Sequence, residues 1–265
     1  HFTARWPTVH DLAAAPDDQV MGQWAGLGYY ARARNLLKCA RVVASEHDGQ
    51  FPDSYDALLK LPGIGPYTAA AIAAIAFDRP ETVLDGNVER VMARLYDIHA
   101  PLPASKPLLK THAAALTLPV RPGDYAQAVM DLGATICIPK SPACGICPLF
   151  APCLARPAGT AASLPQKTPK KPKPTRHGHV YLAQRGTQWT ETPPPVAPPF
   201  EANWQALPAQ VRHTFTHFHL ILQIHHAALP DTHSPDPLLV IDKHAFRPSD
   251  LPTVMRKAYD LWRGQ

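Results

Sequence analysis

The chain has 265 residues, of which 46% are hydrophobic and 18% charged, and its formal net charge is +5. This length exceeds that of one typical domain, and the sequence contains neither a secretory signal nor an apolar run of the roughly 20 residues that a membrane span needs. We therefore expect a soluble, intracellular protein of two domains, with no membrane partner, whose positive charge favours a polyanion.

Apolar residues recur at helical spacing from position 17 to about position 154, with short glycine and proline interruptions. Residues 1–10, by contrast, show no clear helix start. Ser54 and Asp124 stand where helix N-caps are expected. The spacing predicts helices over residues 17–25, 30–47, 54–60, 67–77, 87–98, 106–118 and 125–137.

The composition changes beyond about position 155, where prolines alternate with lysines. This pattern predicts an extended basic linker, either a solvated tether or a tether that also follows phosphates. After it, residues 179–184 and 217–225 alternate as strands do, and residues 251–262 have the pattern of a closing helix. The predicted boundaries are 1–155 for a mostly α-helical first domain, 156–177 for the linker and 178–265 for a small α+β domain.

Four cysteines stand close together after the last predicted helix of the first domain. Cys137, Cys144, Cys147 and Cys153 are separated by six, two and five residues. Disulfides are not expected in an intracellular chain, and zinc sites usually use two short Cys-x-x-Cys pairs, of which only one is present. Ligation of an iron-sulfur cluster is the best physical fit, with zinc as the alternative. Cys39 lies alone on a helical face and is expected in the core.

A glycine-rich connection, LPGIG, joins two predicted helices at positions 61–65. Gly63 and Gly65 permit a tight turn around Ile64, and free amides at the start of the next helix attract an anion such as a phosphate. A plain helix turn has the same pattern. Further along, Asp85 precedes another helix, where an aspartate is most often simply an N-cap.

Taken together, the hairpin, Asp85 and the cysteine spacing resemble the helix-hairpin-helix DNA glycosylases of the endonuclease III superfamily. Two phrases, WAGLGYYARARNL at 24–36 and AVMDLGA at 128–134, resemble the adenine DNA glycosylases of the MutY type, and the resemblance covers essentially residues 1–155. It implies a 4Fe-4S cluster held by the four cysteines. It also implies DNA contacts by the hairpin residues and by Arg32, Arg34 and Lys140.

The resemblance further implies that Asp85, with Asn87 beside it, faces the sugar of a flipped nucleotide. Breaking an N-glycosidic bond builds positive charge on the deoxyribose, which a fixed carboxylate stabilises. The bifunctional branch of the superfamily carries a lysine at the seventh hairpin position. Here that residue is Tyr67, which cannot form an imine, so a monofunctional glycosylase is expected and a lyase is not.

In the C-terminal part, Phe215, Thr216 and His217 resemble the Phe-Ser-His loop with which the Nudix-like domain of this family recognises 8-oxoguanine. Threonine replaces serine but retains a hydroxyl. The proline-rich residues 186–200 stand where the family has a different segment, so a shortened Nudix-like domain is expected. The histidines between positions 213 and 226 lack carboxylate partners, so we do not expect a metal site there.

The family's general acid is a glutamate in an N-terminal segment that is not found in this sequence, and Glu46, Glu81 and Glu89 stand at other positions. We therefore expect a chain that begins downstream of the acid and excises adenine weakly or not at all. The expected substrate is double-stranded DNA with adenine opposite 8-oxoguanine or guanine, bound by a monomer in the bacterial cytoplasm. The alternative is a non-catalytic DNA-binding fragment or a decayed paralogue.

Overall fold

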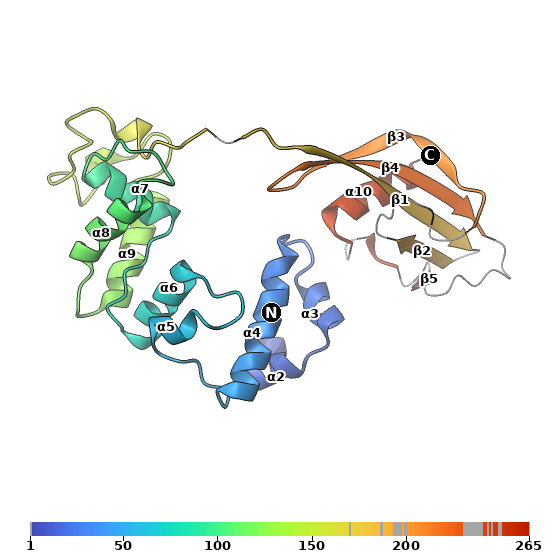
Figure 1. Cartoon of the computed structure of the whole chain (residues 1–265), viewed down its shortest axis with the longest axis horizontal. Helices are drawn as coiled ribbons and strands as arrows, with labels where there is room; N and C mark the ends of the chain where they lie inside the picture. The colour runs from blue at the N-terminus through green and yellow to red at the C-terminus, as the bar shows by residue number, and fades with distance from the viewer. Residues whose placement is uncertain are drawn as a thin grey trace. The chain divides into compact units, whose positions relative to one another are not determined.

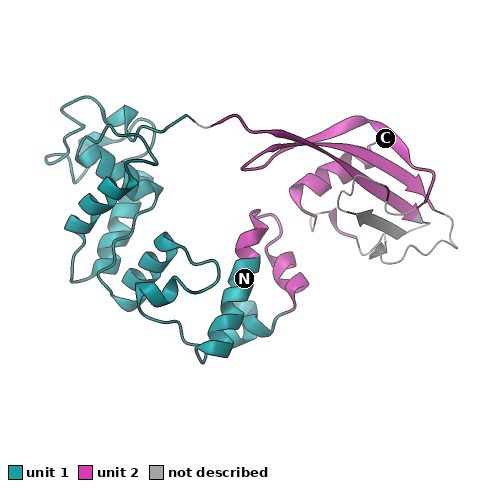
Figure 2. Ribbon diagram, viewed as in Figure 1, with its two compact units in different colours: residues 1–15, 34–170 teal, residues 16–33, 171–265 magenta. Residues whose placement is uncertain are grey.

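The structure is a computed structural model that describes residues 2–169, 171–185, 188–192, 198, 201–229, 241–242, 244, 246–248 and 251–264. It divides into two compact units, one of residues 1–15 and 34–170 and the other of residues 16–33 and 171–265 (Figure 2). Most of the proline-rich segment 186–200 lies outside the described residues, as does Lys170 of the predicted linker. The two units are taken separately below.

Helices make up the first part of the chain (Figure 1). Their bounds are α1 (Phe2–Arg5), α2 (Val9–Ala14), α3 (Asp17–Gln23), α4 (Tyr30–Glu46), α5 (Tyr55–Leu58), α6 (Pro66–Phe77), α7 (Gly86–Leu95), α8 (Lys106–Leu116) and α9 (Pro122–Thr135). Two 3-10 turns follow at η1 (Cys144–Ile146) and η2 (Ala161–Ser163).

The helices predicted from position 17 onward correspond to α3–α9, most of them one to three residues shorter at their ends. Two expectations are wrong. Asp124 is not an N-cap, because α9 begins at Pro122 with Arg121 as its N-cap and Asp124 lies in the first turn. Residues 1–10 do contain a helix start, since Thr8 and Asp11 form a capping box that begins α2.

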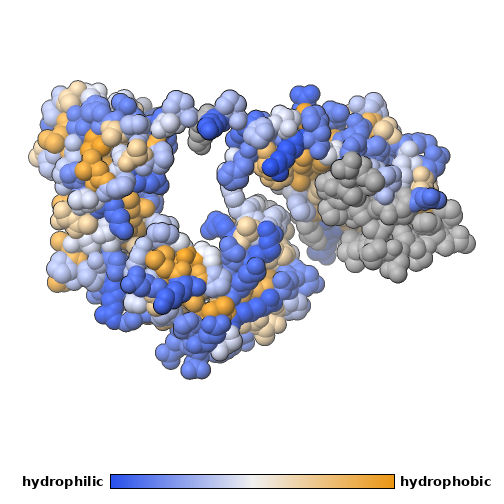
Figure 3. Space-filling model, viewed as in Figure 1, coloured by the Kyte–Doolittle hydropathy of each residue, from blue (hydrophilic) through white to orange (hydrophobic). Residues whose placement is uncertain are grey.

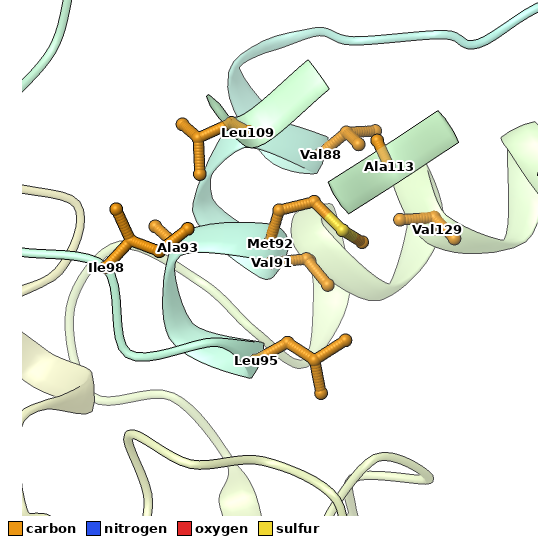
Figure 4. Close-up of a cluster of buried hydrophobic side chains, with 9 residues drawn as sticks. All are labelled: Val88, Val91, Met92, Ala93, Leu95, Ile98, Leu109, Ala113 and Val129. Atoms are coloured by element: carbon orange, nitrogen blue, oxygen red, sulfur yellow. The ribbon is translucent and has the colours of Figure 1, made fainter. Parts of the chain in front are cut away.

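The main core of the helical unit lies between α7, α8 and α9. Every residue of α7 from Val88 to Leu95 is buried, and Figure 4 shows its apolar side chains beside Leu109 and Ala113 of α8 and Val129 of α9. Two glycines bring α9 very close to its neighbours. A Cβ on Gly123 would lie 2.6 Å from the Ala74 carbonyl oxygen of α6, and one on Gly133 would lie 2.6 Å from the Asn87 Cβ of α7. Helix α9 therefore fixes the starting end of α7.

The second unit contains a mixed sheet with the strand order β3-β4-β1-β2-β5 (Figure 1). The strands are β1 (Thr175–Arg185), β2 (Gln188–Thr192), β3 (Gln205–Thr214), β4 (His219–Ala228) and β5 (Ile241–Asp242), and α10 (Thr253–Arg263) follows them. Strands β1 and β4 are parallel, whereas the other pairs are antiparallel. Apolar residues of β1, β3 and β4, including Val180 and Leu222, pack against Ala258 of α10 in one buried cluster. The strands predicted at 179–184 and 217–225 are present, although His217 lies in a turn before β4.

The segment predicted as a linker is held by backbone contacts near both ends. In the helical unit, Leu102 N–H donates to the Gln166 carbonyl (2.9 Å) and Thr168 N–H donates to the Leu102 carbonyl (2.9 Å). In the sheet unit, His219 N–H donates to the Pro174 carbonyl (2.9 Å), and β1 begins at the next residue. The linker is therefore more than a solvated tether at these two places.

Candidate functional site

Asp85 is the N-cap of α7, as its sequence position predicts. One carboxylate oxygen, Oδ1, accepts hydrogen bonds from the backbone N–H groups of Asn87 (2.9 Å) and Val88 (2.8 Å), and Oδ2 accepts one from Asn87 Nδ2 (3.0 Å). Three donors and the positive end of the helix dipole thus hold the carboxylate in one orientation. The side chain is only partly buried, so it keeps an open side.

A buried arginine continues this network from Asp85 into the protein. Arg90 Nη2 donates to Asn87 Oδ1 (2.9 Å) and to the Gly133 carbonyl (2.6 Å), while its Nε donates to the Cys137 carbonyl (2.7 Å). Burial, followed by the charge of Arg94, lowers the pKa of Arg90, whereas Cys137 and Asp85 raise it. Arg90 therefore connects the side chain that orients Asp85 with the start of the cysteine segment.

Tyr67 lies in the first turn of α6 and remains 45% exposed. Its hydroxyl donates to the Met130 sulfur of α9 at 3.7 Å. Met130 lies one helical turn before Gly133, the residue that packs against Asn87. Helix α9 thus contacts both Tyr67 and the residues that hold Asp85.

The glycine-rich hairpin has the tight geometry that its sequence predicts. Gly63 has φ +76°, and a Cβ there would lie 2.5 Å from Asn35 Cβ of α4, so only glycine fits. Gly65 is the N-cap of α6 and offers no capping side chain, and Pro66 occupies the first turn. The amides at the start of this twelve-residue helix are therefore left without a side-chain cap, as an anion-binding terminus requires.

The four clustered cysteines are free thiols that line one apolar cavity of about 30 Å³. Arg94 of α7, only 2% exposed, holds this segment from below. Its guanidinium donates to the carbonyls of Cys137 (3.3 Å), Ile138 (2.8 Å), Pro139 (3.0 Å) and Leu164 (3.0 Å), and also to the Cys137 sulfur (3.3 Å). One helix therefore positions Asp85 at its start and the cysteine segment at its end.

The sulfur atoms share a cavity but do not form a finished coordination site. Among the described residues, no group of three or more Cys, His, Asp or Glu side chains is arranged to hold a metal ion. Burial is the largest cause that raises the pKa of the Cys147 thiol, and the other three cysteines raise it further. The donor set fits a thiolate-bound group in number and in placement around one cavity.

Exposed cations occupy the other predicted DNA-contact positions. Arg32 and Arg34 are exposed on α4, on either side of the buried Ala33, and the Arg32 guanidinium lies 5.7 Å from the Trp24 ring centre. Lys140 is exposed in the cysteine segment. The sequence contains no aspartate or glutamate between Asp131 and Glu191. The cysteine segment and the linker therefore carry no carboxylate side chain that would repel a DNA phosphate.

In the sheet unit, residues 215–218 form the turn between β3 and β4. The Phe215 N–H donates to the Phe218 carbonyl (2.9 Å), and the two rings stack with centres 4.8 Å apart. Thr216 and His217 are exposed at the tip. The three residues predicted for lesion recognition therefore share one loop, with Phe215 at its base and the other two presented outward.

Arg90 and Arg94 are the site residues that the sequence did not reveal. A basic residue within a helix is usually expected to be exposed to solvent. Both arginines can nevertheless be buried because carbonyl groups distant in sequence accept hydrogen bonds from them. The available signal was their spacing, since residues four apart on a helix share one face.

Comparison with known proteins finds similarity both in sequence and in structure. Residues 1–111 match the HhH-GPD superfamily of base excision DNA repair proteins. The adenine DNA glycosylase of Homo sapiens is 47% identical over 157 residues, which are 57% of this chain and 28% of that protein. That of Mycolicibacterium smegmatis is 45% identical over 167 residues, which are 62% of this chain and 57% of that protein.

Two solved structures have a related fold. A thermostable thymine-DNA glycosylase has a TM-score of 0.54 at 28% identity, covering 59% of this chain and 73% of that one. Endonuclease III in a non-covalent complex with DNA has a TM-score of 0.51 at 27% identity, covering 58% of this chain and 72% of that one. Within the described residues, no helix has the length and apolar character needed to cross a membrane.

Proposed function

We propose that this chain comes from a monofunctional adenine DNA glycosylase, because its residues 1–111 match the HhH-GPD superfamily of base excision DNA repair proteins and its relatives include adenine DNA glycosylases. Its proposed substrate is adenine opposite 8-oxoguanine or guanine in duplex DNA, and we expect it to act as a monomer. The chain spans 28% to 57% of the relatives compared above, so the activity is proposed for the protein to which these residues belong.

The posture of Asp85 carries the proposal. Its carboxylate is fixed by two backbone amides and by Asn87, while its partly open side can approach a sugar. As the N-glycosidic bond breaks, positive charge develops on the deoxyribose, and a carboxylate held in place stabilises it without reorganising. We assign this role to Asp85 and the role of orienting it to Asn87.

The hairpin and the exposed cations would hold the DNA. The uncapped amides after Gly65 suit a backbone phosphate, and Gly63 and Ile64 shape the turn that presents them. Arg32, Arg34 and Lys140 would add contacts that depend on charge alone. Because Tyr67 offers a phenol rather than an amine, no imine with the sugar forms and water completes the reaction.

We propose that Cys137, Cys144, Cys147 and Cys153 hold a 4Fe-4S cluster. Their common cavity and the donors that Arg94 directs at the segment support this assignment. Bound there, the cluster would cross-link the segment and keep Lys140 in place for DNA. Purified protein should contain iron and absorb visible light, whereas a zinc site would leave it colourless.

For the sheet unit, we propose an 8-oxoguanine recognition role in a shortened Nudix-like domain. Thr216 and His217 are exposed at the tip of the loop, and the rings of Phe215 and Phe218 stack where the loop begins and ends. This arrangement supports the role. The threonine hydroxyl can donate one hydrogen bond and accept others, as the usual serine does.

A single-turnover assay tests the catalytic proposal. The protein is incubated with a duplex that has adenine opposite 8-oxoguanine, and alkali then cleaves any abasic site. Asp85→Asn is the variant of choice, because asparagine caps a helix about as well as aspartate, so folding should be kept. We expect it to lose at least about 100-fold in rate relative to the parent chain. Asp131→Asn, at an exposed position of α9, is the matched control and should act like the parent.

A non-catalytic DNA-binding role is the second candidate, and the glutamates of residues 1–170 favour it. Glu89 is buried and bound to Lys106 (2.8 Å), Glu81 follows α6 and Glu46 is exposed at the end of α4, so each is placed as a structural or surface residue. A glycosylase without a general acid typically loses about 10²- to 10⁴-fold of its rate. Binding of the mispaired duplex without any alkali-sensitive site would support this candidate over the first.

A further inference from the structure

The last residues of the basic linker contact the β3–β4 turn directly. Lys173 Nζ donates to the Phe215 carbonyl at 3.0 Å, and the Pro174 carbonyl accepts from His219 N–H at 2.9 Å. The Arg176 guanidinium lies 4.4 Å from the centre of the Phe218 ring. Lys173 at the end of the linker and Arg176 at the start of β1 thus contact the two aromatic residues at the base of the loop.

His213 of β3 supports the loop from the sheet, since its ring packs against that of Phe215 with ring centres 4.6 Å apart. Phe215 and Phe218 stack on each other, but they also line a cavity of about 460 Å³ whose other walls include Leu222 of β4 and Met255 of α10. Rings that border an open cavity lack the dense contacts that fix side chains in a core. The contacts that Lys173 and Arg176 make with the loop therefore add to its order.

Lys173 and Arg176 supply those contacts in two complementary ways. The lysine fixes the main chain at one end of the turn through a charge-assisted hydrogen bond. The arginine covers the ring at the other end with a planar cation, which a lysine ammonium reproduces only partly. Both side chains are exposed, so these contacts can order a loop but are too weak to determine whether the unit folds.

We propose that Lys173 and Arg176 are positioning residues that hold Phe215–Phe218 in the conformation that presents Thr216 and His217, and thereby determine preference for 8-oxoguanine over guanine. This inference rests on the proposed function of the loop. The end of the linker is then part of the recognition element, and its charges do more than attract phosphate.

Binding measurements test the effect on specificity. The parent chain and each variant are titrated with two duplexes that differ only in carrying 8-oxoguanine or guanine opposite an adenosine analogue that resists hydrolysis. Lys173→Met and Arg176→Ala should each lower the preference for 8-oxoguanine about two- to fivefold, and the double variant about tenfold. Lys173→Arg should restore the preference, and Arg176→Lys should restore it in part. Lys171→Met, an equally exposed control, should weaken both duplexes alike, as loss of a phosphate contact does.

Hydrogen exchange of the Phe215 amide tests, without DNA, whether Lys173 and Arg176 hold the loop in place. This amide is bonded to the Phe218 carbonyl, so it should exchange several-fold faster in Lys173→Met and Arg176→Ala but not in Lys171→Met. If all three variants exchange alike, the positioning role of Lys173 and Arg176 is wrong. If exchange rises while the preference is unchanged, the specificity role is wrong. A parent chain that does not distinguish the two duplexes would instead refute the proposed recognition function. The exchange result would still decide whether Lys173 and Arg176 position the loop.

Discussion

Replacing Gly133 with alanine has two opposing effects on stability, and the typical size of each is known. Gly133 lies inside α9, and alanine at an unobstructed helix position is about 1 kcal/mol more favourable than glycine. Here, however, the added Cβ would lie 2.6 Å from Asn87 Cβ and 3.1 Å from Asn87 Cα. Helix α7 would have to move, and overpacking of this kind typically costs about 1–3 kcal/mol. We therefore expect Gly133→Ala to lower the free energy of unfolding by up to about 2 kcal/mol.

The displaced residue is the one whose amides orient the Asp85 carboxylate, so excision should fall as well. Urea unfolding followed by far-ultraviolet circular dichroism measures the stability, and the alkali assay measures excision. Gly86→Ala is the matched control, because no atom lies within 4 Å of its added Cβ, and it should be neutral or slightly stabilising. An increase in stability for Gly133→Ala would refute the close contact between α9 and α7.

Three further predictions concern buried charges. Arg94→Met leaves carbonyls of the cysteine segment without a donor and should cost about 3–5 kcal/mol in urea unfolding, whereas Arg79→Met, at an exposed ion pair, should cost less than about 1 kcal/mol. Lys106→Met leaves the buried carboxylate of Glu89 without its cation, so this variant should unfold at a lower urea concentration than the parent. Burial, followed by a neighbouring imidazole, lowers the pKa of His225 below 6.5. Its contribution to stability is therefore complete above pH 6.5 and is lost as the pH falls through the lowered pKa, so the melting temperature of the parent should decline more on acidification than that of His225→Phe.

The sequence predicted the elements whose signals are local. Helical periodicity located α3–α9, and the position of Asp85 before a helix predicted its capping role. The capping box of Thr8 and Asp11 is an equally local signal, but the six-residue helix that it begins is too short to show helical periodicity. The Asp124 prediction failed because Pro122 can already occupy the first turn of a helix, which moves the cap upstream.

Non-local features could not be predicted in this way. Strand β3 contains Pro208, which argues against a strand, and the structure accommodates it where the pairing with β4 shifts register between Ala206 and Gln210. The buried hydrogen bonds of Arg94 reach residues more than forty positions away, so no window of sequence contains both partners. The contacts of Lys173 and Arg176 with the β3–β4 turn are hidden for the same reason.

Helix α7 has a practical consequence for protein engineering. Its ten residues span about 15 Å. The Asp85 cap lies at one end, and Arg94, which binds the cysteine segment, lies near the other. A cysteine segment transplanted from a relative would need the matching pair of arginines, since its main chain is moored to them. Chimeras should therefore be joined outside residues 85–164, so that the helix and the segment it anchors are exchanged as one piece.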